Sequence, residues 1–205
     1  MPPKKSSSKQ PVLKTEHHGD GFHRPRFKIC ISGAAETGHC APDAFEKAQA
    51  LGRAIAERGM ILITGATVGI PYWAAKGAKS AGGVVFGISP AASYVAHRKT
   101  YNLPVDYHDI IMYTGFDYAG RNLLLVRSSD AIISICGRMG TLNEFTIAFE
   151  DQKPIGILEG TGGAADMVRM IVEGAHRGSG NIVYETDPDR LLDKIVALIK
   201  KEQEG

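Results

Sequence analysis

Residues 117–150 read DYAGRNLLLVRSSDAIISICGRMGTLNEFTIAFE, and this stretch decides the fold. Its pattern predicts a helix, a strand, a glycine loop and a second helix. The strand is the apolar run Ala131–Ile135, which lacks polar alternation and is therefore typical of a parallel sheet covered on both faces. Gly137 and Gly140 follow, and a helix restarts at Thr141. Glycines let the backbone approach a ligand and a helix start attracts anions, so we expect a phosphate at this loop.

Two charged side chains flank the predicted anion site. Arg121 lies on the helix before the strand, and Glu144 lies on the first turn of the helix after it. Each also has a purely structural interpretation. Thr141 and Glu144 fit a capping box, and Asp117 with Arg121 fits a surface pair four residues apart. Arg121 shares its helix face with two leucines, which favours a cleft over open solvent.

The composition predicts one globular domain. The chain has 205 residues, of which 43% are hydrophobic and 22% are charged, enough for one well-packed core. We expect a disordered basic tail over residues 1–25 and a Rossmann-like nucleotide-binding domain over residues 26–205. There is no apolar run of about 18 residues and no apolar block behind the basic start, so we expect no membrane span and no secretory signal.

The charge distribution argues against a nucleic-acid partner. Residues 1–28 hold seven Lys/Arg and two Asp/Glu, which leaves 17 basic and 20 acidic residues for the rest of the chain. A mildly acidic body is a poor surface for a phosphate backbone. We therefore predict a small-molecule partner.

The three cysteines, Cys30, Cys40 and Cys136, show no metal-ligand spacing. An odd number of cysteines without such spacing indicates reduced thiols, so we expect a cytoplasmic protein with no metal site. Cys30 and Cys136 are predicted to fill strand positions.

Strands and helices are predicted to alternate along the whole chain. This order indicates an α/β fold, a single doubly wound and mainly parallel sheet with helices on both faces. Ligands of such sheets gather at the carboxyl ends of the strands, so Ser32, Gly33 and Gly65 are further candidate contacts. Residues 90–109 interrupt the alternation, and we expect them to form a mobile flap near the site.

Two nucleotide motifs are absent from the first strand–helix turn. Gly33 and Gly38 have the spacing of a Walker motif, but His39 and Cys40 stand where that motif needs Lys and Ser or Thr. The turn also lacks the glycine pattern of dinucleotide-binding proteins. A nicotinamide site is therefore not expected.

Two longer stretches carry a family resemblance. They are LGRAIAERGMILITGATVGIPYWAAKGAKSAGGVVFGISP (residues 51–90) and GRNLLLVRSSDAIISICGRMGTLNEFTIAF (residues 120–149). Both resemble the LONELY GUY (LOG) and lysine-decarboxylase-like group of Rossmann-type proteins, over roughly residues 27–199. Characterised members of that group release a free base from a nucleoside 5′-monophosphate and leave ribose 5-phosphate. The resemblance implies the same hydrolase activity here, in a homodimer and without metal or cofactor.

The motif of that group is P-G-G-x-G-T-x-x-E, with an arginine on the helix before it. The resemblance assigns catalysis to Arg121 and Glu144. It matches Gly137, Gly140 and Thr141 to the glycine loop, which would bind the phosphate, and Arg138 and Met139 of the same loop are further candidate phosphate contacts. The chain departs from the motif at Cys136 and Arg138.

The chemistry of the proposed site leaves alternatives open. A carboxylate can stabilise an oxocarbenium-like sugar or activate water, which suits Glu144 to cleavage of an N-glycosidic bond. A carrier for a nucleotide or a phosphorylated cofactor, such as the molybdenum cofactor, would keep the glycine loop without needing Arg121 or Glu144. A DNA-processing protein of the same fold is a third alternative.

Overall fold

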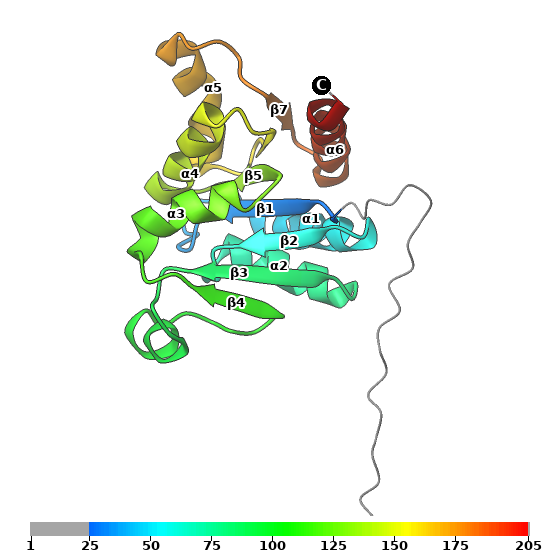
Figure 1. Cartoon of the computed structure of the whole chain (residues 1–205). Coiled ribbons are helices and arrows are strands. Elements are labelled where there is room, and N and C mark those ends of the chain that lie inside the picture. Colours follow the sequence, from blue (N-terminus) through cyan, green and yellow to red (C-terminus); the bar gives the residue numbers. More distant parts are fainter. Residues whose placement is uncertain (1–24, 205) are drawn as a thin grey trace, which may run out of the picture.

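The structure is a computed structural model, and it describes residues 25–204. Apart from Pro25, the tail predicted for residues 1–25 lies outside this range. Seven strands alternate with helices along the chain (Figure 1). In chain order the elements are β1 (Lys28–Gly33), α1 (Ala44–Glu57), β2 (Ile61–Thr64), α2 (Ile70–Ser80), β3 (Val84–Ser89), the π-helical turn η1 (Ala96–Thr100), β4 (Ile110–Tyr113), α3 (Asp117–Arg127), β5 (Ala131–Ile135), α4 (Met139–Glu150), β6 (Ile155–Leu158), α5 (Gly163–Ala175), β7 (Ile182–Glu185) and α6 (Pro188–Glu204).

The strands form one parallel sheet in the order β4-β3-β2-β1-β5-β6-β7. This confirms the predicted doubly wound α/β fold. The chain builds the sheet outward from β1 in one direction and then returns to add β5 on the other side of β1. The register of β1 and β5 runs from Ile29 beside Ala131 to Gly33 beside Ile135. The strand order therefore reverses between β1 and β5, which is where such sheets bind ligands.

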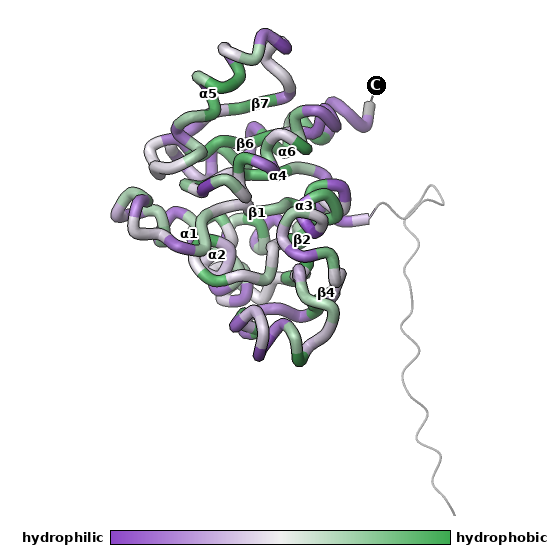
Figure 2. Tube along the Cα trace, turned by 90° about the vertical axis from the view of Figure 1, so that its left-hand side faces the viewer, coloured by the Kyte–Doolittle hydropathy of each residue, from purple (hydrophilic) through white to green (hydrophobic). Residues whose placement is uncertain are grey.

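Helices cover both faces of the sheet (Figure 1). Alternate residues of β1 explain the two layers, because Ile29 and Ile31 pack with α1, α2 and α6, while Cys30 packs with α3, α4 and α5. Hydrophobic residues follow the strands, and hydrophilic residues gather on the outer turns (Figure 2). Among the described helices, none is long and apolar enough to cross a membrane.

Two glycines let α1 and α2 pack closely. A Cβ atom on Gly52 of α1 would lie 2.0 Å from the carbonyl oxygen of Ala74, and one on Gly77 of α2 would lie 2.0 Å from that of Gln49. Each glycine thus accepts the backbone of the other helix. Because a backbone carbonyl cannot move aside as a side-chain tip can, neither position has room for a larger residue.

The segment 90–109 differs from the mobile flap that its composition predicted. His97 is fully buried; its Nδ1 lies 2.8 Å from Ser89 Oγ, and its Nε2 lies 2.8 Å from Pro104 O. One imidazole therefore connects η1 to the end of β3 and to the chain that follows η1. Tyr101 also donates a hydrogen bond to Asp117 at the start of α3, so the segment braces that helix.

We expect Gly52→Ala to lower the free energy of unfolding by about 1–3 kcal/mol, the usual cost of overpacking, despite the better helix propensity of alanine. Gly174→Ala is the matched control, because Gly174 lies in α5 with nothing within 4 Å of the added Cβ. The control should gain roughly 0.5–1 kcal/mol. Urea denaturation measures both, and equal effects of the two changes would contradict the packing role of Gly52.

Candidate functional site

A cleft of about 440 Å³ opens at the carboxyl ends of β1 and β5. This volume is within the usual range for small-molecule sites. Its walls come from the end of β1 and the loop after it, the residues after β2, the first half of α3 and the start of α4. Of the ten predicted site residues, Gly137 and Met139 are not among those that line the cleft. The other eight line it: Ser32, Gly33, Gly65, Arg121, Arg138, Gly140, Thr141 and Glu144.

Glu144 of α4 projects toward β1 at the base of the cleft. It is 6% exposed, and its Oε2 accepts a hydrogen bond from Ser32 Oγ. The alternation of β1 explains this contact, because Ser32 points to the same face as Cys30, the face that α4 covers. With its side-chain amide turned over, Asn122 also donates to Glu144 Oε1 at 2.8 Å. Each carboxylate oxygen therefore has a partner within the protein.

The environment of Glu144 shifts its protonation. Burial raises the pKa of its carboxyl above the ordinary value of 4.5, while the Arg121 charge and the Ser32 hydrogen bond oppose that rise. Burial disfavours the charged form because the low-dielectric interior solvates it poorly. The carboxyl thus keeps its proton to a higher pH than an exposed glutamate does.

Arg121 of α3 lies beside this carboxyl and is only 4% exposed. Its Nη1 donates to Ile88 O at 3.2 Å, but within the described part of the chain its buried Nε has no hydrogen-bond partner. A Cβ on Gly65 would lie 1.8 Å from Arg121 Nη1. Gly65 therefore makes room for the guanidinium, which places a positive charge suited to an anion at the wall of the cleft.

The structure contradicts both structural interpretations of these two residues. Helix α4 begins at Met139, two residues before the predicted start, and Arg138 precedes it with an extended backbone. Glu144 therefore lies beyond the first turn, where a capping box cannot form, and it contacts β1 instead. Asp117 accepts from Tyr101, and Arg121 is buried, so the two do not form the predicted surface pair.

The two glycines around the start of α4, Gly137 before the helix and Gly140 in its first turn, have different roles. Gly137 has a φ of +95°, and a Cβ there would lie 2.5 Å from Thr141 Cβ. Glycine is therefore needed at this position for the turn of the backbone and for its contact with Thr141. A Cβ on Gly140 would meet nothing within 4 Å, because that position faces the open cleft. Across the mouth, Arg138 Nη1 donates to Glu36 Oε2 at 2.7 Å, and both side chains are exposed.

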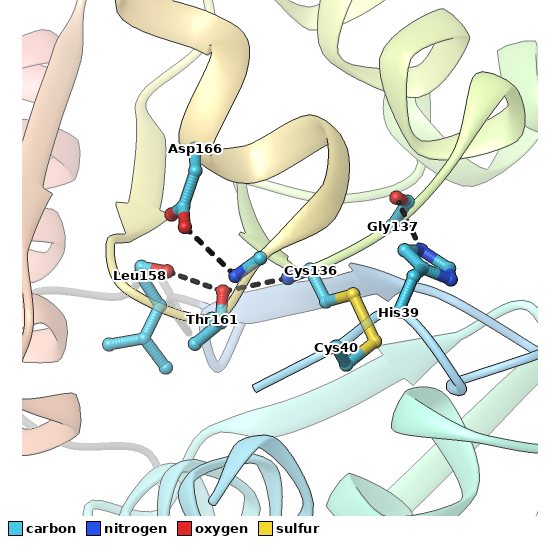
Figure 3. Close-up of a disulfide and its surroundings, with 8 residues drawn as sticks. His39, Cys40, Cys136, Gly137, Leu158, Thr161 and Asp166 are labelled. Carbon is cyan, nitrogen blue, oxygen red and sulfur yellow. Dashed lines mark hydrogen bonds between the residues drawn. A yellow bond between two sulfur atoms is a disulfide. The ribbon is translucent and has the colours of Figure 1, made fainter. Parts of the chain in front are cut away.

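A disulfide behind the loop corrects the prediction of three reduced thiols. Cys40 and Cys136 are bonded, with Cα atoms 5.6 Å apart, although 96 residues separate them (Figure 3). Only Cys30 is free, and it is buried in β1 as predicted. Cys136 lies just after β5 rather than within it. The pairing of β1 with β5 brings the loops that carry the two cysteines together. Because the expected cytoplasmic location rested on three reduced thiols, the disulfide removes the basis for that expectation.

Nine lining residues were missed by the sequence predictions, among them Asn122, Tyr118 and Glu36. Asn122 directly follows Arg121, and Tyr118 lies one turn before it, so helical spacing around Arg121 indicates both. Glu36 lies in the turn after the first predicted strand, but nothing local relates it to Arg138. Only the fold brings those two side chains together.

The raised pKa of Glu144 predicts a pH-dependent stability. The folded state binds this proton more tightly than the unfolded state, so its contribution is fully present below pH 4.5 and is lost as the pH rises through the folded pKa. The free energy of unfolding should therefore decline less between pH 4.5 and neutral pH in Glu144→Gln than in the wild type. Urea denaturation across that range tests this, with the exposed Glu150→Gln as control. Identical declines in wild type and Glu144→Gln would contradict it.

Proteins of known sequence and structure resemble this chain. An uncharacterised protein of Archaeoglobus fulgidus is 38% identical over 132 residues, which are 64% of this chain and 82% of the relative. The molybdenum cofactor binding protein of Rippkaea orientalis is 28% identical, with a TM-score of 0.69 over 88% of this chain and 99% of that one. The Moco carrier protein of Chlamydomonas reinhardtii is 26% identical, with a TM-score of 0.70 over 86% and 99%.

DNA processing protein A of Helicobacter pylori is similar in fold alone. It is 18% identical, with a TM-score of 0.58 over 85% of this chain and 81% of that one. The relation to the LOG group is at the level of the SLOG proteins, because the matching family model does not single out the LOG enzymes. Residues 26–192 match the model of the SLOG cluster4 family, and the chain therefore belongs to that family.

Proposed function

We propose that the chain is a binding protein or carrier for a phosphorylated small molecule, such as a nucleotide or a phosphorylated cofactor. One observation carries this proposal. Arg121, whose buried Nε has no hydrogen-bond partner in the described part of the chain, lines the cleft, whereas the only deeply buried carboxylate of the cleft, that of Glu144, is already engaged by the protein. Such a site suits the holding of a phosphate better than the activation of water.

The phosphate would lie at the start of α4. The first amides of a helix have no partner within the helix, and the helix dipole adds partial positive charge there. Gly140 leaves the backbone open to the cleft, and Arg138 at the rim can exchange its ion pair with Glu36 for the ligand. A guanidinium is well suited to phosphate oxygens.

Glu144 would act as an anchor for the walls of the site. Its carboxyl joins α4 to Ser32 on β1 and to Asn122 on α3, and its charge faces Arg121. These contacts hold the Arg121 guanidinium beside the cleft. The anchoring role explains why a binding protein would contain both residues.

Two similar structures support this proposal. The proteins from Rippkaea orientalis and Chlamydomonas reinhardtii are described as binding or carrying the molybdenum cofactor, and each aligns over almost its whole length. Their identities of 28% and 26% support a related ligand class.

Hydrolysis of a nucleoside 5′-monophosphate is the second candidate function. The observation that favours it is the proximity of Arg121 and Glu144 in one buried cleft, as the resemblance to LOG enzymes implies. An ionised Glu144 would stabilise the oxocarbenium-like sugar while water attacks C1′ and the base leaves. The partners on both oxygens of Glu144 count against this role.

We further propose that the chain forms a homodimer through the face beside α3. Parallel register sets Ile110 beside Phe86 and Met112 beside Ile88, so both β4 side chains point to the face that α3 covers. They remain 54% and 38% exposed, because α3 does not extend over the edge strand. An exposed apolar edge of this kind favours association with a second copy.

For ligand binding, we expect AMP to bind and adenosine to bind at least about tenfold more weakly, because the phosphate makes charge-assisted hydrogen bonds. Calorimetry gives both affinities, and chromatography of the mixtures should recover AMP unchanged. Gly140→Ala should weaken AMP binding without loss of stability, since its Cβ enters the open cleft. Gly174→Ala, remote from the cleft, should bind as the wild type does.

Two results would overturn the binding proposal. Equal affinity for AMP and adenosine would contradict the proposed phosphate site, because the phosphate would then contribute nothing to binding. Release of adenine and ribose 5-phosphate, abolished in Glu144→Gln, would establish the hydrolase instead.

For the dimer, light scattering after gel filtration should give twice the 22.0 kDa chain mass. Met112→Glu should shift the protein to the monomer, because a charge cannot be buried unpaired in an apolar interface. Met170→Glu on α5, which is 63% exposed and remote from β4, should stay dimeric. A dimer that survives Met112→Glu would place the interface elsewhere.

A further inference from the structure

The disulfide joins the two loops that flank the cleft. Cys40 ends the loop after β1, whose residues Ala34, Ala35 and Glu36 line one wall. Cys136 directly precedes Gly137, where the loop into α4 begins (Figure 3). A covalent bond therefore connects the wall of the cleft to the anion-binding loop, across 96 residues of sequence.

Weaker contacts surround this bond. The Cys136 amide donates to Thr161 Oγ1 at 2.8 Å, and the Ala41 amide donates to Thr161 O at 2.9 Å. His39 Nε2 lies 3.2 Å from Gly137 O (Figure 3). Thr161 thus holds both cysteine loops at their bases without the disulfide. What the disulfide adds is restraint on the loop segments that extend from these bases toward the cleft.

The conformation at the disulfide needs such a restraint. Cys136 has a φ of +53°, in the left-handed region that a residue with a side chain disfavours, and Gly137 follows with a φ of +95°. These two residues turn the chain from β5 into the loop before α4. The amides of Ala164 and Ala165 also donate to the carbonyls of Gly137 and Cys136, at 2.9 and 2.8 Å, and the disulfide adds the covalent restraint on the Cys136 side chain.

We propose that Cys40 and Cys136 form a reversible redox switch, in which the disulfide holds the segment from Gly137 to Thr141, which includes the start of α4, ready for its ligand and reduction releases it. This inference rests on the proposed function, because it assigns regulation to the same anion-binding cleft. Cys30 takes no part, since it is buried in β1 away from the pair.

Exposure decides where reduction begins. Cys136 is fully buried, whereas Cys40 is partly exposed, so a thiolate such as that of glutathione reaches Cys40 Sγ first. Its attack forms a mixed disulfide at Cys40 and expels Cys136 as a thiolate, which takes up a proton. A second glutathione attacks the mixed disulfide and releases Cys40 and glutathione disulfide. Two glutathione thiols are oxidised, one protein disulfide is reduced, and the reverse steps restore it.

The test follows the full chain through buffers of set glutathione and glutathione disulfide ratios. Alkylation after denaturation and mass spectrometry should find one free thiol in the oxidised form and three in the reduced form. Hydrogen exchange, measured without ligand, should show faster exchange of residues 136–141 on reduction and no change in β2. The affinity for AMP should fall about tenfold in step with the thiol count, the scale expected when a binding loop loses preorganisation.

The variants separate the switch from other roles of the cluster. Cys40→Ser should exchange and bind as the reduced wild type does, whatever the redox buffer. His39→Gln should keep the full response, because the imidazole is not part of the bond. If reduction changes hydrogen exchange of residues 136–141 but neither the oxidised nor the reduced protein binds AMP, the result would support the switch and count against the proposed function.

Two results would overturn the switch. One is equal loop exchange and equal affinity in forms that differ in thiol count, since the bond would then be structural only. The other is uptake of one Co²⁺ by the reduced protein with thiolate charge-transfer absorption. If both Cys40→Ser and His39→Gln abolish that absorption, the three side chains, whose ligand atoms lie within 4.8 Å of one another, form a metal site instead.

Discussion

The pairing of β1 with β5 is the constraint on which the rest of the structure depends. Their register, with Ser32 beside Ser134 and Gly33 beside Ile135, sets the two strand ends level with each other. The loops that leave these ends must then diverge to opposite faces of the sheet, because α1 and α4 cover different faces. The divergence opens the cleft, and the same level ends bring the Cys40 and Cys136 loops together behind it.

Close backbone approach is what allows such a sheet to carry a buried charged site. Gly65 gives space to the Arg121 guanidinium, and Gly33 does the same for Ile70, since a Cβ there would lie 2.4 Å from Ile70 Cγ2. The space beside Gly65 allows the Arg121 guanidinium to lie in the interior. The space beside Gly33 allows Ile70 of α2 to pack closely against β1. Because the guanidinium and the Glu144 carboxyl are both desolvated, each depends on the other and on polar neighbours for its place.

The loop before α4 shows how one motif serves both packing and binding. Gly137 in this loop fits against Thr141, whereas Gly140 in the first turn of α4 faces the cleft, so only Gly140 is free to respond to a ligand. Cys136 and Arg138 are the two residues that depart from the LOG pattern, and each has a partner. Cys136 is bonded to Cys40 in the disulfide, and Arg138 forms an ion pair with Glu36. Both partners lie on the loop after β1. Cys136 and Arg138 therefore both connect the segment before α4 to the loop after β1.

The sequence by itself determined the elements and their order. The apolar run Ala131–Ile135 predicted a strand with the bounds that β5 has, because hydrophobic periodicity is a local property. The sequence also indicated the glycine loop and eight residues that line the cleft, since ligands bind where parallel strands end. The start of α4 was two residues off, because the extended backbone of Arg138 has no local sequence signal.

Only the tertiary structure decided which strands are neighbours and which side chains meet. Ser32 and Glu144 are 112 residues apart and Cys40 and Cys136 are 96 apart, yet both pairs form bonds because β5 inserts beside β1. No periodicity relates positions so distant, and composition alone pointed to reduced thiols. The physical reason is that local patterns set the conformation of each segment, whereas contacts between segments follow from how the whole sheet buries its two faces.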